Sequence, residues 1–127
     1  AKRSIPKPSD RSQEFELFLS LILIGVGRAR RGEILAAEQH IKSYALSFAL
    51  KLIRSANPTN QNADSLNDFR RFERDYPQLA GELHEIVLLP TEAAAKALCQ
   101  LVMRELNATE VEVGQYRVIA KRLGWAI

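Results

Sequence analysis

The chain has little cysteine and little histidine, which excludes two common ways of stabilising a small fold. One cysteine among 127 residues cannot form an internal disulfide. The two histidines, His40 and His84, have no i, i+4 histidine partner, so no zinc or other metal site is expected. With only six glycines and five prolines, and 46% hydrophobic residues, the chain is neither fibrous nor disordered. We expect one soluble globular domain in a reducing, cytoplasmic compartment.

The chain also lacks a strong charge surplus and a long apolar run. Its 18 basic and 15 acidic side chains leave a net charge of +3, too small to indicate a nucleic acid or an anionic membrane as a partner. The most apolar run, residues 17–26, contains Ser20 and Gly25 and is well short of the roughly 20 residues that span a bilayer. We therefore expect no nucleic-acid partner and no membrane partner, and we interpret the run as a buried helix.

The start of the chain is typical of a linker. Pro6 and Pro8 fix their own φ and bias the residues before them away from the helical region, which predicts an extended linker over residues 1–9. The first residue is Ala1 rather than methionine, and the basic start does not lead into a signal-type apolar stretch, which is consistent with a trimmed or excised chain.

Helical patterns fill the rest of the chain. Asp10 caps a predicted helix over residues 11–30, Gly32 predicts a tight turn, and a second long helix follows to about residue 55. The short connection makes the two helices antiparallel. Residues 56–67 are polar and are predicted to form the most mobile loop.

Shorter helices are predicted over residues 68–75, 77–87, 91–107 and 109–123, the last with a capping box formed by Thr109 and Glu112. The predicted fold class is all-α, a helical bundle built on a long antiparallel helix pair with three or four shorter helices. Residues 10–127 are expected to form one domain.

Catalytic motifs are mostly missing. No glycine-rich phosphate loop is present, because Gly25 and Gly27 lie inside an apolar helix and are better explained by close helix packing. Cys99 lies among alanines and leucines, as an inert core thiol does. Glu14 and Glu16 lie at the start of the first helix, where a solvated surface role competes with a role as general base for a neighbouring active site.

One resemblance rests on the order of features along the chain. A long helix with an aromatic start, an Arg-Gly-Glu turn at residues 31–33 and a second long helix precede a polar loop. The segment Arg70-Arg71-Phe72-Glu73-Arg74-Asp75-Tyr76-Pro77-Gln78-Leu79 and an alanine-rich helix over residues 91–106 follow. This order resembles the C-terminal helical domain of bacterial nucleotidyltransferases of the polymerase-beta superfamily, which include aminoglycoside and lincosamide nucleotidyltransferases.

The resemblance implies that nucleotide binding and acceptor binding are carried out by different domains. In that family an N-terminal α/β domain carries a Gly-Ser motif and an Asp-x-Asp pair that bind the nucleoside triphosphate and magnesium. This chain contains neither motif, so it would be the substrate-binding half and would not transfer a nucleotide by itself. Its partners would be an N-terminal nucleotidyltransferase domain or a separate catalytic subunit, and a small-molecule acceptor, within a homodimer.

The resemblance also assigns roles to residues. Glu14, or Glu16 if the alignment slips, would take the proton from the acceptor hydroxyl. Glu33, His40 and Tyr44 would line an acceptor pocket between the two long helices, although a core or surface role for each remains favoured from the residues alone.

Two other classes remain open from the residues. A freestanding helical interaction module would dimerise through the apolar face of the first helix, or would serve as partner subunit of a separate nucleotidyltransferase, as in toxin-antitoxin pairs. A DNA-binding helix-turn-helix needs an exposed basic recognition helix, which the modest net charge disfavours.

Overall fold

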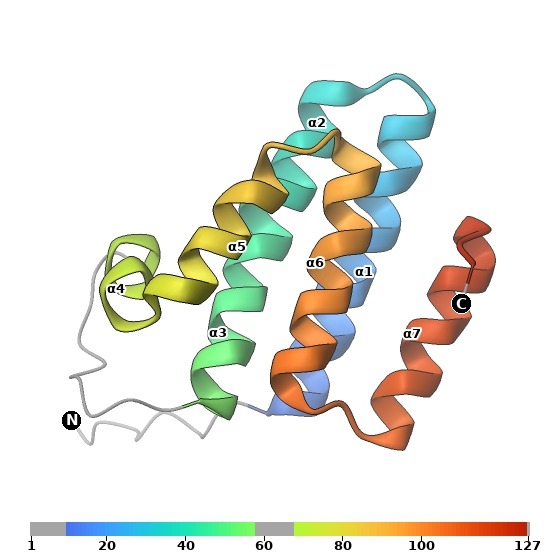
Figure 1. Ribbon diagram of the computed structural model, residues 1–127. Coiled ribbons are helices and arrows are strands. Elements are labelled where there is room, and N and C mark those ends of the chain that lie inside the picture. Colours follow the sequence, from blue (N-terminus) through green and yellow to red (C-terminus); the bar gives the residue numbers. More distant parts are fainter. Residues whose placement is uncertain (1–9, 58–67, 127) are drawn as a thin grey trace, which may run out of the picture.

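The computed structural model describes residues 10–57 and 68–126, with the backbone alone for residues 68–70. The predicted linker over residues 1–9 and nearly all of the predicted polar loop lie outside the described residues. The described residues form helices and no strand, in the order α1 (Arg11–Arg30), α2 (Ile34–Gln39), the π-helix η1 (His40–Ala45), α3 (Leu46–Ala56), α4 (Asp68–Asp75), α5 (Pro77–Val87), α6 (Thr91–Leu106) and α7 (Glu110–Leu123) (Figure 1). The predicted all-α class is confirmed.

The helix boundaries follow the capping residues that the sequence contains. The Asp10 side chain accepts hydrogen bonds from two backbone N–H groups in the first turn of α1, at 3.0 and 3.4 Å. Gly32 has a φ of +85° and turns the chain from α1 into α2. Thr109 and Glu112 form the predicted capping box of α7, and Gly124 ends that helix with a φ of +74°.

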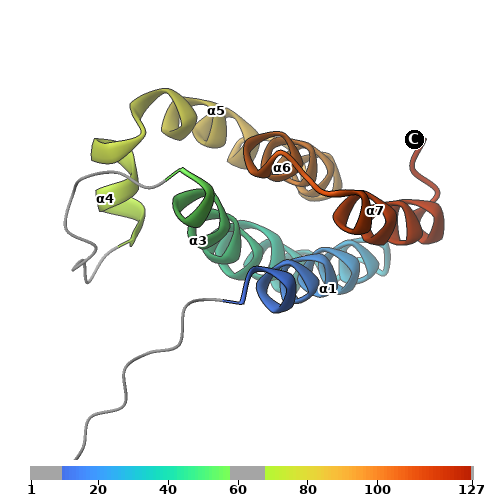
Figure 2. The ribbon, with the colours of Figure 1, turned by 90° about the horizontal axis from the view of Figure 1, so that it is seen from below.

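The long antiparallel pair consists of α1 on one side and the continuous α2–η1–α3 helix on the other. In Figure 2 this pair forms one layer, and α5, α6 and α7 form a row on one side of it, with α7 packed against α1. The opposite face of the pair is not covered by any helix among the described residues. No helix in residues 10–57 or 68–126 combines the length and apolar character needed to cross a membrane.

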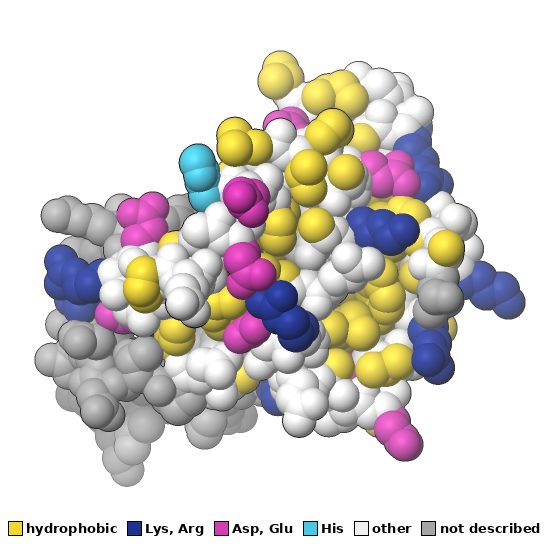
Figure 3. Space-filling model, in the orientation of Figure 1, with side chains coloured by type: hydrophobic (Ala, Val, Ile, Leu, Met, Phe, Trp, Pro, Cys, Tyr) yellow, Lys and Arg dark blue, Asp and Glu magenta, His cyan; other side chains and the backbone are white. Residues whose placement is uncertain are grey.

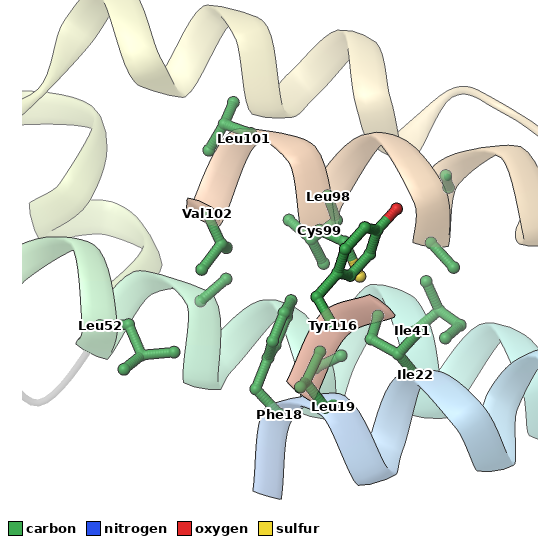
Figure 4. Close-up of a cluster of buried hydrophobic side chains, with 14 of the residues drawn as sticks. Phe18, Leu19, Ile22, Ile41, Leu52, Leu98, Cys99, Leu101, Val102 and Tyr116 are labelled. Carbon is green, nitrogen blue, oxygen red and sulfur yellow. The ribbon is translucent and has the colours of Figure 1, made fainter. Parts of the chain in front are cut away.

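The core lies between the two layers. Figure 4 shows side chains from α1, η1, α3, α6 and α7 pointing toward one another, and the largest fully buried ones include Phe18, Ile22, Ile41, Leu52 and Leu98. Cys99 is completely buried among them, and burial raises the pKa of its thiol. The interpretation of Cys99 as an inert core residue is therefore confirmed.

The π-helix was not predicted from the sequence, yet it explains the spacing of the buried residues. Buried side chains of the second long helix step by four residues at each turn, at Ala37, Ile41, Ala45, Ala49 and Ile53. In a regular α-helix each four-residue step rotates the side chain by about 40°, so this line would leave the interface within a few turns. The wider turn of the π-helix reduces that rotation, which keeps these residues against α1.

The segment that carries the resemblance holds α4 and α5 against α3. The side chain of Asp75 is only 1% exposed and accepts a hydrogen bond from Nη1 of Arg54 at 3.0 Å. The guanidinium of Arg54 also lies over the rings of Phe72 and Tyr76, at 5.9 and 5.7 Å from their centroids. Pro77 then begins α5, as predicted. These residues of the segment therefore have structural roles.

Candidate functional site

Glu14 lies in the first turn of α1 and is half-buried. Its Oε1 atom is shielded from solvent and has no hydrogen-bond partner. A carboxylate oxygen in this state is costly, because it has lost water without gaining a donor. A hydroxyl or ammonium group that donates to this oxygen would remove the cost, and it can do so only after the Glu14 carboxylate turns toward solvent.

Glu16 points to a different part of the molecule. It is exposed, and its Oε1 accepts a hydrogen bond from Nε2 of Gln115 on α7 at 3.3 Å. It also lines a shallow groove between α1 and α7, together with Ser20 and Val118. Since two residues along a helix differ by about 200° in direction, Glu14 and Glu16 cannot serve one site.

Glu33 lies at the opposite end of the long pair, immediately before α2. Its carboxylate accepts a hydrogen bond from Nη1 of Arg28 at 2.8 Å and a longer one from Nε of Arg31 at 3.4 Å. These hydrogen bonds, the one from Arg28 first, lower the pKa of Glu33. Glu33 is thus a paired surface carboxylate that joins α1 to α2.

His40 and Tyr44 lie together on η1. Their rings meet edge to face with centroids 5.6 Å apart. Nδ1 of His40 is 2.9 Å from the backbone oxygen of Ala36, a contact that assigns the Nδ1 proton to this bond and leaves Nε2 as the acceptor in the neutral ring. Tyr44 is 44% exposed, so the pair presents an imidazole and a phenol at the surface. π-Helices of this kind frequently occur at functional sites.

Gly25 is the residue of α1 that η1 approaches most closely, next to His40. A Cβ atom at Gly25 would lie 3.1 Å from Cβ of His40 and 2.5 Å from Cδ1 of Ile41. The interpretation of Gly25 as a residue that permits close helix packing is therefore confirmed, whereas Gly27 has only an ordinary contact, 3.7 Å from Arg31. Because Glu14 is 11 residues before Gly25, it lies about 16 Å along the pair from His40.

The predicted residues are therefore distributed along the pair rather than gathered in one pocket. His40 and Tyr44 are together, Glu33 lies immediately before the same helix and seven residues before His40, and Glu14 is distant from all three. Of the predicted residues, Glu16 alone lines one of the four cavities and grooves found among the described residues, the groove between α1 and α7. His40 and Tyr44 are four residues apart, a spacing that places two side chains on one face of a helix, so their proximity could have been predicted from the sequence.

A cavity that sequence reasoning missed lies between α3, α4 and α5. It has a volume of about 180 Å³ and is lined by Leu46, Leu50, Phe72, Glu73, Ala80, Leu83, His84 and Val87. All of these except Glu73 and His84 are apolar, and Glu73 and His84 are exposed at its edge. The cavity is large enough for one small ring or a branched alkyl group. Its lining comes from three helices. Because hydrophobic periodicity describes each helix by itself, no sequence signal would have found the cavity.

Two polar clusters and an apolar patch lie at the end of the molecule where α1 is followed by α2, which is at the top in Figure 1. Arg30 donates two hydrogen bonds to Glu92, at 2.9 and 2.6 Å, and the indole of Trp125 donates a third at 2.8 Å. These contacts, led by the one from Arg30, lower the pKa of Glu92. Thr91 donates to Glu38 at 2.5 Å, so the start of α6 is joined to both α1 and α2. Both clusters are satisfied within the fold.

The apolar patch at this end comes from the start of α2 and the connection between α5 and α6. Exposed hydrophobic side chains gather there in Figure 3, and they belong to Ile34, Leu35, Leu88 and Leu89.

Among the residues that the structure describes, no group of three or more histidine, cysteine, aspartate or glutamate side chains is placed to hold a metal ion. Comparisons with known protein families, curated proteins and solved structures find no match to this chain.

Proposed function

We propose that this chain is the acceptor-binding helical domain of a nucleotidyltransferase whose catalytic domain lies outside this chain. The resemblance in the order of sequence features supports this proposal, and so does the long antiparallel pair with one uncovered face. The observation that carries it is the unpaired Oε1 of Glu14, at the position where the resembling family has an acid that reaches the active site.

The chemistry proposed for Glu14 is general base catalysis. The acceptor hydroxyl gives its proton to the Glu14 carboxylate while its oxygen forms a bond to the α-phosphorus of the nucleoside triphosphate, and pyrophosphate leaves. In the resembling family the α/β domain supplies the triphosphate site and magnesium. The described residues offer no set of ligands for magnesium, and the contribution of this chain is to hold the acceptor and to take its proton.

His40 and Tyr44 are the proposed further polar contacts for the acceptor, about 16 Å along the pair from the level of Glu14. An imidazole acceptor and a phenol donor at edge-to-face distance suit a ligand with several hydroxyl or amino groups. Glu33 is a weaker candidate, since its carboxylate already binds two arginines.

The test begins with the protein at its native length, isolated together with whatever copurifies, and its intact mass. The proposal expects a nucleotidyltransferase domain with Gly-Ser and Asp-x-Asp motifs, in the same chain or in a copurified subunit. The assembled enzyme is then incubated with magnesium, nucleoside triphosphates and a panel of hydroxylated acceptors. Transfer is measured as pyrophosphate release and as the mass of the product.

Glu14→Gln should lower kcat by about a hundredfold or more, because the base is lost while the shape is kept. Glu16→Gln is the matched control from the same turn and should retain activity, since its carboxylate faces Gln115. Absence of any nucleotidyltransferase domain in the native assembly would refute the proposal. Full activity in Glu14→Gln would remove Glu14 from the mechanism.

A further inference from the structure

The cavity between α3, α4 and α5 has apolar walls that are shielded from solvent. Its apolar lining consists of Leu46, Leu50, Phe72, Ala80, Leu83 and Val87, around a volume of about 180 Å³. Leu50 and Phe72 are 2% exposed, and Leu83 is 6% exposed. Walls of this kind offer water no hydrogen-bond partner, and an apolar cavity of about 150 Å³ in a protein accepts benzene. The cavity therefore favours an apolar group about the size of a benzene ring.

The cavity arises from the way that four helices pack. Both α3 and α5 pack against α4 and against α6, but they do not pack closely against each other. Figure 2 shows α4 beside the ends of α3 and α5. The space between α3 and α5 is therefore enclosed by a frame of neighbouring helices, and its lining comes from three of them.

Polar contacts outside the cavity hold this frame in place. The buried carboxylate of Asp75 accepts a hydrogen bond from Arg54 at 3.0 Å, which joins α4 to α3. Arg104 donates two hydrogen bonds to Glu82, at 3.2 and 2.9 Å, which join α6 to α5. Because these contacts position the walls, a ligand does not have to order them, and the entropic cost of binding is small.

The mouth of the cavity is formed by two polar side chains, those of Glu73 and His84, which are both exposed. A carboxylate only accepts hydrogen bonds, and a neutral imidazole has one acceptor nitrogen. Glu73 forms no ion pair with any described residue. The mouth therefore offers hydrogen-bond acceptors and a negative charge to a positively charged donor.

The arginines of the surrounding helices do not supply this positive charge. No arginine or lysine is among the described residues that line the cavity. The charge of Arg54 is paired with that of Asp75. Arg71 and Arg74 are two residues and one residue from Glu73, so along a helix they differ from it in direction by about 200° and 100°. A ligand is thus the source of positive charge that fits the mouth.

We propose that this cavity binds a small organic cation, a primary ammonium group carried on a benzene-sized ring or on a branched alkyl group. The apolar group occupies the cavity, and the ammonium donates hydrogen bonds to Glu73 and His84 at the mouth. Such charge-assisted hydrogen bonds are stronger than those between neutral groups. None of Glu14, His40 and Tyr44 lines this cavity, so the proposal does not rest on the proposed enzymatic function.

The first test compares three probes that share a benzene ring, namely benzylammonium, benzyl alcohol and benzoate. Binding to the native-length protein is measured by isothermal titration calorimetry at neutral pH. Benzylammonium should bind with a dissociation constant of about 1 mM or less. It should bind about tenfold more tightly than benzyl alcohol, and benzoate should bind most weakly because Glu73 repels it. Equal affinities for benzylammonium and benzyl alcohol overturn the proposal, and so does the absence of saturable benzylammonium binding below about 10 mM.

The second test removes the charge at the mouth. Glu73→Gln should abolish the preference for benzylammonium and leave the affinity for benzyl alcohol unchanged, because the shape of the cavity is kept. The matched control is Glu110→Gln, which changes the net charge equally at an exposed position on α7 and should retain the preference. A preference that persists in Glu73→Gln contradicts the proposal.

The third test fills the cavity. Ala80→Leu adds three carbon atoms to the lining and should weaken benzylammonium binding by more than about tenfold. Gly81→Leu is the matched control on the same helix, since Gly81 is exposed and nothing lies within 4 Å of an added Cβ. It should bind benzylammonium as the wild type does. Unchanged binding in a folded Ala80→Leu variant places the ligand elsewhere and overturns the proposal.

Methyl NMR of the wild-type protein decides the location of the probe even if Ala80→Leu does not fold. The aromatic ring of bound benzylammonium should shift the methyl signals of Leu50, Leu83 and Val87, which line the cavity. The methyl signals of Leu35, which is 88% exposed on α2, should stay unchanged. Shifts that spare the three lining residues refute the proposed site.

Discussion

Gly25 and Ile41 define the closest approach of the two long helices. A Cβ atom at Gly25 would lie 2.5 Å from Cδ1 and 2.8 Å from Cγ1 of Ile41. Ile41 is only 1% exposed, so its side chain has no free space into which it can move. The absence of a side chain at Gly25 thus sets the distance between α1 and η1, and with it the position of His40 and Tyr44.

Gly25→Ala should lower the free energy of unfolding by about 1 to 3 kcal/mol, because the overpacking cost exceeds the gain in helix propensity. Gly114→Ala is the matched control, since nothing lies within 4 Å of the added Cβ. It should raise stability by about 0.5 to 1 kcal/mol. Urea titration followed by circular dichroism measures both. Equal effects of the two substitutions would show that α1 and η1 are not in tight contact.

Arg11 and Glu112 connect α1 to the first turn of α7. Two hydrogen bonds from the Arg11 guanidinium reach Glu112, at 2.8 and 2.7 Å, and the Glu112 side chain is 8% exposed. The hydrogen bond from Arg11 is the main reason that the pKa of Glu112 is lowered in the folded protein. A carboxyl group whose pKa is lower in the folded than in the unfolded protein stabilises the fold at pH values above its unfolded pKa. That stability is lost as the pH falls below about 5 toward the folded pKa.

Glu112→Gln should therefore cost about 1 to 2 kcal/mol at pH 7, and the difference from wild type should shrink as the pH falls below about 5. Glu110→Gln changes an exposed carboxylate in the same turn and should have little effect at either pH. Urea titrations at pH 7 and at lower pH give the comparison. A cost that stays constant with pH would mean that the carboxylate charge is not what stabilises the contact.

Leu83 is a wall of the cavity between α3, α4 and α5, and it is 6% exposed. Leu83→Ala should lower the free energy of unfolding by about 2 to 4 kcal/mol, because it removes buried methyl groups and enlarges a space that is already present. Leu88→Ala, at the end of the same helix where the side chain is 71% exposed, should change it by less than about 0.5 kcal/mol. Thermal or urea unfolding distinguishes them, and similar costs would argue that α5 does not pack as described.

The helices and their ends were predictable because the signals are local. Asp10, Gly32, Thr109 and Gly124 each act on backbone groups within a few residues of themselves, so their identity suffices to place a boundary. The π-helix was not predictable in this way. Its signal, a four-residue step from Ala37 to Ile53, is informative only once the neighbouring helix is known.

For the candidate site, too, some features could be predicted from the sequence and others depend on packing. Glu14 was selected for its place on the first helix, but its unpaired oxygen is a property of the packed structure. Glu16 was an equal candidate by sequence spacing, and only its contact with Gln115, 99 residues away, separates the two. His40 and Tyr44 were selected as polar residues among apolar ones, and the edge-to-face geometry of their rings is known only from the structure.

The sequence by itself determined that this chain is helical, where its helices begin and end, and that α1 has apolar residues on every side. Tertiary structure alone decided which of those sides is covered. Asp75 meets Arg54, 21 residues away, and Arg11 meets Glu112, 101 residues away, and these contacts set the second layer on one face of the long pair. Local patterns fix backbone conformation, but burial depends on residues that the chain brings together from a distance.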